Sequence, residues 1–493
     1  MDRQGEQSRS RRNRVSVAVA LVCATALVGA VAGAKGKSAA PHAPQGSGPG
    51  SGTVQFSAPT SGPVRFAGTL DRRAVLRGTD GLVRMELVIG AEAQSAERLT
   101  RVPTDLMVIL DRSGSMAGEK IENARAAVRE LLAQLGAEDR FGLVSYSDGA
   151  TLVIPLTTAD ASARDRWLAT LAAIEANGST NMSSGLDLGL DTIERMRSAG
   201  RVPRVILLSD GLANMGDPSH EGLVRRAGRA ARGEYMLTTV GVGADFNEYL
   251  MTALADAGTG NYYYLKTGNG LASVFAREFG AARATVASGL AVQIEPADGV
   301  RVVDAAGYPL EQAPAAAPGA VIVRPGSLFA GQERRIWVTL AVPSQAVGDV
   351  ELGRFALSYG DGAQRTTLAF AEMPRVACVQ DENDFYASVD APSWTRSVLV
   401  DGYNAMQQQV AREVKAGRHD EALKAIQRFR DETQAMNQRI QSKPVEEQLH
   451  SVDKLETEVA AAFVGANQPA KQNELSKSRD AEARDLRRAG SKR

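Results

Sequence analysis

The stretch "LMVILDRSGSMAGEKI", from Leu106 to Ile121, decides the fold of the middle of the chain. Its apolar start predicts a buried strand, and the apolar spacing that begins near its end predicts an amphipathic helix. Between strand and helix lie Asp111, Ser113 and Ser115, and the glycine between the serines permits a tight loop. No histidine stands near to activate either serine, so the segment indicates a ligand set rather than a nucleophile.

The same alternation of strand and helix extends over residues 104–283. Strand candidates such as "RFGLVSY", "RVILLS" and "YMLTTVGV" are separated by amphipathic segments such as "SSGLDLGLDTIERMRSA". Continuous apolar strands between such helices predict an α/β fold with a doubly wound, mainly parallel sheet. The strand-rich segments on either side, 67–103 and 284–385, predict one antiparallel β-sandwich into which the α/β unit is inserted. Apolar stripes over 395–466 predict a C-terminal helical bundle.

The two ends of the chain differ in composition from the middle. A basic segment followed by an apolar run that ends in Ala-Gly-Ala predicts a signal peptide or membrane anchor over residues 1–34. Residues 35–66 are rich in Gly, Ser and Pro and predict a flexible linker, and the charged residues 467–493 predict a disordered tail. We therefore expect export across the cytoplasmic membrane, to the periplasm, envelope or medium, with a possible N-terminal tether.

The composition of the chain excludes several functions. Of 493 residues, Lys+Arg and Asp+Glu each account for 57, so the formal net charge is zero. Nucleic-acid-binding proteins usually carry a basic surplus, so we expect no nucleic-acid partner. Four histidines and two cysteines provide little material for a zinc site or for histidine-based catalysis.

Two further polar loops match the chemistry of the opening segment. Thr180 lies in "NGSTNMSSG" before a predicted helix, and Asp210 follows the predicted strand "ILLS". The carboxyl ends of parallel strands meet at one edge of a sheet, so we expect these residues to lie near Asp111. Oxygen donors alone favour Mg²⁺, with Mn²⁺ or Ca²⁺ as alternatives. Two carboxylates balance a divalent charge, and we expect an Asp or Glu of a protein partner to complete the coordination.

Five residues border these loops and are candidates for the ligand-binding rim. They are Arg112, Met116, Asp148, Asn181 and Asn214. For the first two, solvent-facing loop positions are the favoured interpretation. For Asp148 the favoured interpretation is a hairpin turn, and turn formation explains Asn214 as well as a rim role does, because Asp and Asn favour turns.

The order of these residues resembles a known binding motif. Asp111-x-Ser113-x-Ser115, then Thr180, then Asp210 followed by glycine, resembles the metal-ion-dependent adhesion site of von Willebrand factor type A (VWA) domains. The resemblance covers 104–283 and implies that both serines and the threonine hold the cation, with the aspartates acting directly or through water. More loosely, the whole order of segments resembles bacterial proteins described as calcium-activated chloride channel-like or inter-α-trypsin-inhibitor heavy-chain-like.

The favoured function is therefore an exported, metal-dependent protein-binding module for adhesion or scaffolding, and not an enzyme. The main alternative is an assembly scaffold that acts through its C-terminal helices while the metal site is closed internally. A Mg²⁺-dependent phosphohydrolase would use Asp111 as nucleophile but needs a second aspartate where Ser113 stands. A pore would need several spanning segments or a closed barrel, and the sequence offers one apolar run.

Overall fold

The computed structural model describes residues 55–59, 62–92, 102–198, 200–210, 213–242, 247–265, 285–306, 308–313, 317–360 and 364–490. The predicted signal or anchor segment, 1–34, lies outside these residues. Within the described ranges, no helix combines the length and apolar character needed to cross a membrane.

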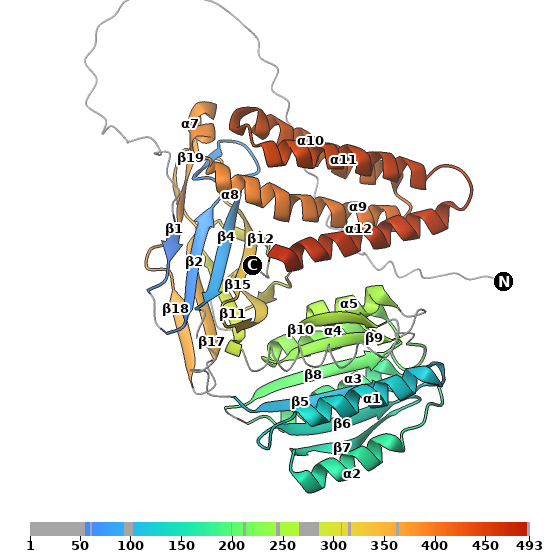
Figure 1. Cartoon of the computed structure of the whole chain (residues 1–493). Helices are drawn as coiled ribbons and strands as arrows, with labels where there is room; N and C mark the ends of the chain where they lie inside the picture. The colour runs from blue at the N-terminus through green and yellow to red at the C-terminus, as the bar shows by residue number, and fades with distance from the viewer. Residues whose placement is uncertain are drawn as a thin grey trace, which may run out of the picture. The chain divides into compact units, whose positions relative to one another are not determined.

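A six-stranded sheet forms the centre of the α/β unit, with strand order β10-β9-β8-β5-β6-β7 (Figure 1). The strands are β5 (Thr104–Asp111), β6 (Arg140–Tyr146), β7 (Ala150–Thr158), β8 (Val202–Ser209), β9 (Met236–Val242) and β10 (Thr259–Leu265). Neighbouring strands are parallel except β6 and β7, which are antiparallel. The prediction of a mainly parallel sheet is confirmed.

Helices cover both faces of this sheet. They are α1 (Glu119–Gln134), α2 (Ala161–Ala172), α3 (Met182–Arg195), α4 (His220–Arg232) and α5 (Glu248–Ala257). Alternate residues of β5 enter different cores, because successive side chains of a strand point to opposite faces. Val108 packs in the cluster that includes Leu131 of α1, whereas Ile109 packs in the cluster that includes Leu186 of α3.

Strands that precede and follow the α/β unit in the sequence together form a β-sandwich. One sheet has the order β1-β2-β4-β15-β12 and the other β13-β14-β11-β17-β18, and a small third sheet has the order β16-β19-β3. The strands before the α/β unit are β1 (Gln55–Ser57), β2 (Val64–Leu70), β3 (Ala74–Leu76) and β4 (Leu82–Ala91). Those after it are β11 (Thr285–Pro296), β12 (Arg301–Asp304), β13 (Glu311–Gln312), β14 (Val321–Phe329), β15 (Glu333–Ala341), β16 (Gly348–Glu351), β17 (Gly353–Gly360), β18 (Arg365–Ala369) and β19 (Arg375–Val379).

The pairing of β4 with β15 joins segments from the two sides of the α/β unit. These strands pair without a break from Leu82 opposite Ala341 to Gly90 opposite Glu333. The prediction of a flexible linker over 35–66 is wrong for its C-terminal part, because β1 and the start of β2 lie within this range. Phe66 is buried there and stacks on Phe370. Apolar side chains that reach the sandwich core therefore overcome the Gly and Ser content of this segment.

The C-terminal part of the chain is helical. It contains α7 (Glu382–Ala387), α8 (Ala391–Arg396), the π-helical turn η4 (Ser397–Gly402), α9 (Tyr403–Lys415), α10 (His419–Ile440), α11 (Lys443–Ala462) and α12 (Gln468–Gly490). The prediction of disorder over 467–493 is wrong for α12. Leu475 packs against the bundle core, and Ser476 donates to the Ala411 carbonyl at 2.9 Å. The Lys, Arg and Glu residues of this segment are good helix formers, so a few contacts are enough to order it.

Helix α3 approaches the sheet closely because two of its core-facing residues are glycines. A Cβ atom at Gly185 would lie 2.6 Å from Cδ1 of Tyr146, and one at Gly189 would lie 2.5 Å from Cδ1 of Ile109. Tyr146 and Ile109 are fully buried, so neither can move away freely. Glycine at these positions fixes the distance between α3 and the strands that lead to the polar loops.

We expect Gly185→Ala to lower the free energy of unfolding by about 1–3 kcal/mol, because the added methyl overpacks Tyr146. Gly228→Ala is the matched control within α4, where the nearest heavy atom to a new Cβ is a flexible arginine nitrogen at 3.5 Å. That control should be neutral or stabilising by up to about 1 kcal/mol, because alanine is the better helix former. Urea unfolding of both variants measures the difference, and equal effects would contradict the packing argument.

Candidate metal centre

Three loops carrying the predicted metal ligands meet at one edge of the parallel sheet. Asp111 ends β5, and Asp210 directly follows β8, the strand that pairs with β5. The Gly114 amide donates to the Gly178 carbonyl at 2.9 Å and ties the first loop to the loop that carries Thr180. The Thr180 amide donates to Oδ1 of Asn214 at 2.9 Å and ties that loop to the third. The structure therefore brings all the predicted ligand positions together.

Asp111 is fully buried and held by three hydrogen bonds. Its Oδ1 accepts from the Ser113 amide at 2.8 Å, and its Oδ2 accepts from the Ser209 hydroxyl at 2.7 Å and the Tyr146 hydroxyl at 3.2 Å. Burial raises the pKa of Asp111, and the negative charge of Asp210 raises it further. The hydrogen bonds from Ser113 and Ser209 lower it and so offset part of this shift. The carboxylate is thus fixed in orientation.

Hydroxyl groups lie beside these carboxylates. The Oγ atoms of Ser113 and Ser115 are 3.2 Å apart; Ser113 is buried and Ser115 is exposed. Thr180 is also buried, at the N-terminal end of α3. Hydroxyl oxygens can coordinate a cation without neutralising its charge. A cation held partly by hydroxyls would therefore still attract a further anionic ligand.

Asp210 has one satisfied carboxylate oxygen and one that is not. Its side chain is only 1% exposed; Oδ2 accepts from Lys120 Nζ at 2.9 Å, whereas Oδ1 is buried with no hydrogen-bond partner among the described residues. An unsatisfied buried polar atom is costly, and more so when it is charged. The donor set consists of oxygens and one carboxylate oxygen lacks a partner, so these residues fit a hard divalent cation.

Carboxylates are too few at these loops to hold a metal ion alone. Within the described ranges, no group of three or more His, Cys, Asp or Glu side chains is placed to hold a metal ion. A cation at these loops would therefore need hydroxyl oxygens in addition to the two carboxylates.

Three of the rim candidates hold the loops in place. Asp148 lies in the turn between β6 and β7 and accepts from the Ser179 amide at 2.8 Å, which lowers the pKa of this exposed carboxyl. Asn181 caps α3 by accepting from the Ser184 amide, and its own side chain donates to the Asp148 carbonyl. Asn214 is exposed while it holds Thr180.

The remaining rim candidates differ in exposure. Arg112 is half-buried and its guanidinium contacts Oδ1 of Asn177. Met116 is wrong as a rim residue, because it is fully buried in the core shared with Ile121. Met215, which sequence reasoning missed, is 44% exposed beside Asn214 and supplies the apolar surface at this position.

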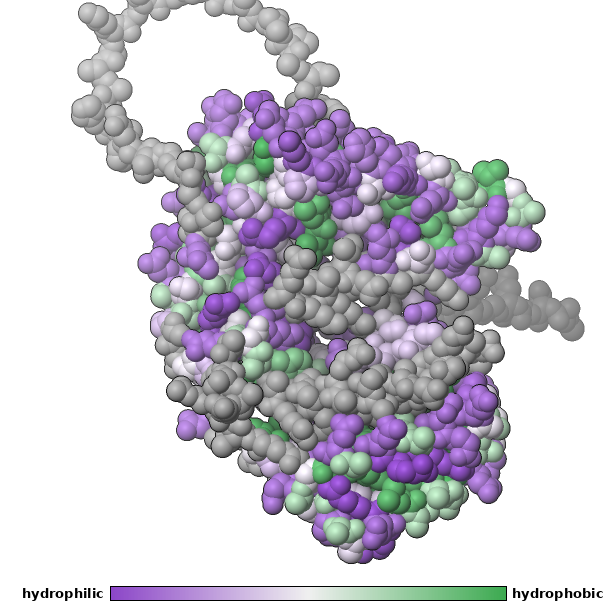
Figure 2. All heavy atoms as spheres, viewed as in Figure 1, coloured by the Kyte–Doolittle hydropathy of each residue, from purple (hydrophilic) through white to green (hydrophobic). Residues whose placement is uncertain are grey.

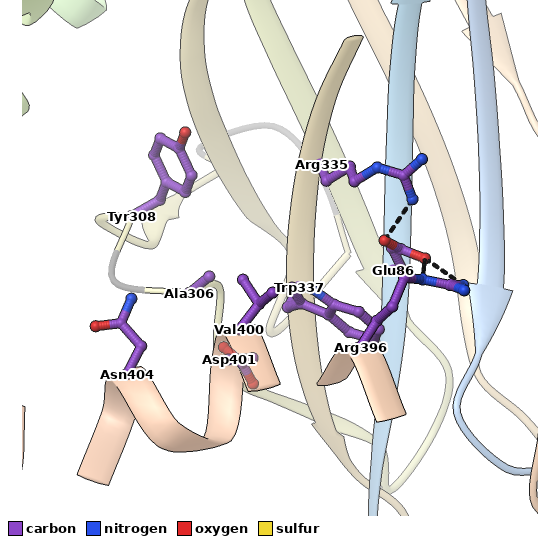
Figure 3. A pocket seen from close by; sticks show the side chains of 9 residues that line it. All are labelled: Glu86, Ala306, Tyr308, Arg335, Trp337, Arg396, Val400, Asp401 and Asn404. Carbon is purple, nitrogen blue, oxygen red and sulfur yellow. Dashed lines mark hydrogen bonds and ion pairs between the residues drawn. The ribbon is translucent and has the colours of Figure 1, made fainter. Parts of the chain in front are cut away.

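Two cavities lie away from these loops, around the buried Glu86 of β4. The smaller, about 60 Å³, is bounded by β15, by Ala306 and Tyr308, and by η4 and the start of α9 (Figure 3). Glu86 accepts from Arg335 at 2.7 Å and from Arg396 at 2.9 Å. These ion pairs join α8 to the sheet. No predicted metal ligand lines either cavity.

Comparisons with known proteins agree with the α/β architecture. A solved von Willebrand factor type A structure from Catenulispora acidiphila shares the fold with a TM-score of 0.61 and 16% identity, over 87% of this chain and 97% of that one. Residues 105–277 match the von Willebrand factor type A domain family. The chain therefore contains a VWA domain, which confirms the resemblance seen in the sequence.

The curated relatives match a smaller part of the chain. YfbK of Escherichia coli is 29% identical over 244 residues, which are 48% of this chain and 41% of YfbK. Human inter-alpha-trypsin inhibitor heavy chain H4 is 30% identical over 165 residues, which are 32% of this chain and 18% of that protein. The chain thus spans less than half the length of either relative.

Proposed function

We propose that the VWA domain binds a protein partner through a divalent cation, with Mg²⁺ as the native ion and Mn²⁺ or Ca²⁺ as substitutes. Ser113, Ser115 and Thr180 would hold the cation together with Asp111 and Asp210. The observation that carries the proposal is the buried Oδ1 of Asp210, which has no hydrogen-bond partner among the described residues. When bound, the cation supplies a positive centre that a partner's Asp or Glu side chain can complete.

The protein's own residues prepare this site for binding. Tyr146 and Ser209 fix Asp111, and the bond from the Thr180 amide to Asn214 fixes the loop before α3. A rigid site loses little conformational entropy when a ligand binds, and this increases affinity. Arg112, Asn214 and the exposed Met215 would contact the partner around the carboxylate.

Binding is favoured over catalysis because none of the described residues provides an activating base for the serines. The hydroxyls of Ser113 and Ser115 lie within hydrogen-bond distance of each other, and Lys120 is paired with Asp210. His220, in the same domain, stacks on Tyr249 with ring centroids 4.6 Å apart. A nucleophilic serine needs an adjacent general base, and these contacts supply none.

The alternative, a scaffold acting through the C-terminal helices, receives less support. The apolar stripes of α9, α10 and α11 pack against one another in one core that includes Met406, Ile426 and Val452. Figure 2 shows a mostly hydrophilic surface over α10 and α11 on the visible face. Val464, at 68% exposed, follows α11 and is the large apolar side chain that stands out from the described part of this bundle.

We propose that the chain is exported, because the basic and apolar segment at 1–34 is typical of a signal or anchor. Mass analysis of the chain isolated from envelope and medium tests this proposal. A mature N-terminus near Ala34, or an intact chain in the membrane fraction, would agree with it. An intact chain found in the cytosol would contradict it.

We expect the full chain to bind Mg²⁺ or Mn²⁺ and to become more stable to heat. A ligand that binds only the folded state raises the midpoint of thermal unfolding. Asp210→Ala, Asp111→Ala and Thr180→Ala should each weaken Mn²⁺ binding at least about tenfold, equivalent to about 1.4 kcal/mol. Asp165→Ala, which removes an exposed carboxylate on α2, is the matched control and should bind normally. Isothermal titration measures each affinity.

A second titration tests the carboxylate of the partner. Acetate added to the Mn²⁺-loaded chain should displace bound water and lower the relaxation enhancement of water protons, whereas acetamide should not. Equal effects of the two would contradict completion by a carboxylate. If the folded Asp210→Ala variant bound Mn²⁺ normally, the proposal that Asp210 is part of the metal site would be wrong.

A further inference from the structure

Lys120 places a fixed positive charge inside the candidate metal centre. It lies in the first turn of α1, a few residues after Ser115, and its Nζ donates to Oδ2 of Asp210 at 2.9 Å. Its side chain is 28% exposed, whereas that of Asp210 is 1% exposed. The ammonium group therefore approaches a buried carboxylate from the solvent side.

The two oxygens of Asp210 have different surroundings. Lys120 holds Oδ2, and Oδ1 is buried without a partner among the residues that the structure describes. One carboxylate can serve two cations when each binds a different oxygen. The contact of Lys120 with Oδ2 thus leaves Oδ1 available for a metal ion.

A charge count shows what this lysine changes. Asp111 and Asp210 contribute two negative charges and Lys120 contributes one positive charge, so the residues alone carry one net negative charge. On the rim, Arg112 and Asp148 are opposite in charge and offset each other. A divalent cation would bring the loaded centre to one net positive charge, whereas without Lys120 the loaded centre would be neutral.

We propose that Lys120 sets the ligand preference of the centre: it weakens binding of the divalent cation and strengthens binding of an anionic carboxylate to the loaded site. This inference rests on the proposed function. A like charge nearby disfavours the metal, and the same charge favours an incoming anion. The lysine would make the loaded centre discriminate carboxylates from neutral oxygen donors such as amide carbonyls.

The test compares Lys120→Met with Lys120→Arg in the full chain. Methionine keeps much of the side-chain length and removes the charge, whereas arginine keeps the charge. We expect Lys120→Met to bind Mn²⁺ about tenfold more tightly and to bind acetate, once loaded with Mn²⁺, about tenfold more weakly, a size reasonable for one charge at a partly exposed site. Lys120→Arg should stay close to the unaltered chain in both.

The metal-free protein provides a separate readout. Without Mn²⁺, Lys120→Met leaves Asp210 buried and unpaired, so its thermal midpoint should fall and should rise more steeply on addition of Mn²⁺. Lys424→Met is the control, because Lys424 forms an exposed pair with Glu421 and its removal should leave the midpoint unchanged.

Each outcome decides between defined alternatives. If Lys120→Met binds Mn²⁺ more weakly, Lys120 is only a positioning residue for Asp210, and the inference is wrong. If Lys120→Met binds Mn²⁺ more tightly but acetate equally well, the lysine leaves when metal enters, and the inference is again wrong. If the unaltered chain binds no Mn²⁺, the proposed function fails and the inference fails with it.

Discussion

The arrangement of the polar loops depends on two aspartates buried at the ends of adjacent parallel strands. The charge of Asp210 contributes to the raised pKa of Asp111, although burial is the larger cause, and both side chains are almost inaccessible to solvent. Burying like charges in one place is unfavourable unless other groups compensate. Hydroxyls and an amide compensate Asp111, whereas Lys120 compensates one oxygen of Asp210 and the other has no partner among the described residues.

The rest of the VWA domain holds these strand ends in register. β5 and β6 pair so that Asp111 lies opposite Tyr146, and the glycines of α3 allow that helix to pack directly on Tyr146. The same helix begins at the loop that carries Thr180. A change in helix packing would therefore reach the site through Tyr146 and through the start of α3. In the sandwich, β4 from before the VWA segment pairs without a break with β15 from after it.

Much of the architecture could be predicted from the sequence because its signals are local. Apolar strands, amphipathic helices and the spacing around Asp111 and Asp210 each lie within a few residues, and the α/β fold with its sandwich and helices is confirmed. The identities of the metal ligands remain a prediction. Tyr146, Ser209 and Lys120 were missed because their contacts depend on strand register and helix direction, which no short segment reveals.

Two errors have the same origin. Met116 follows a polar loop, so its position in sequence did not reveal that it enters the core next to α1. The C-terminal segment is highly charged, so its composition did not reveal the contact with α9 that orders its helix-forming residues. In both cases, tertiary contacts decided what local composition could not.

Anomalous diffraction from crystals of the full chain soaked in Mn²⁺ would locate the cation. We expect a single strong peak at the edge of the parallel sheet, bonded to Oγ atoms of Ser113 and Ser115 and close to Oδ1 of Asp210. Ordered loops without a peak, or a peak only at some other place on the chain, would contradict it.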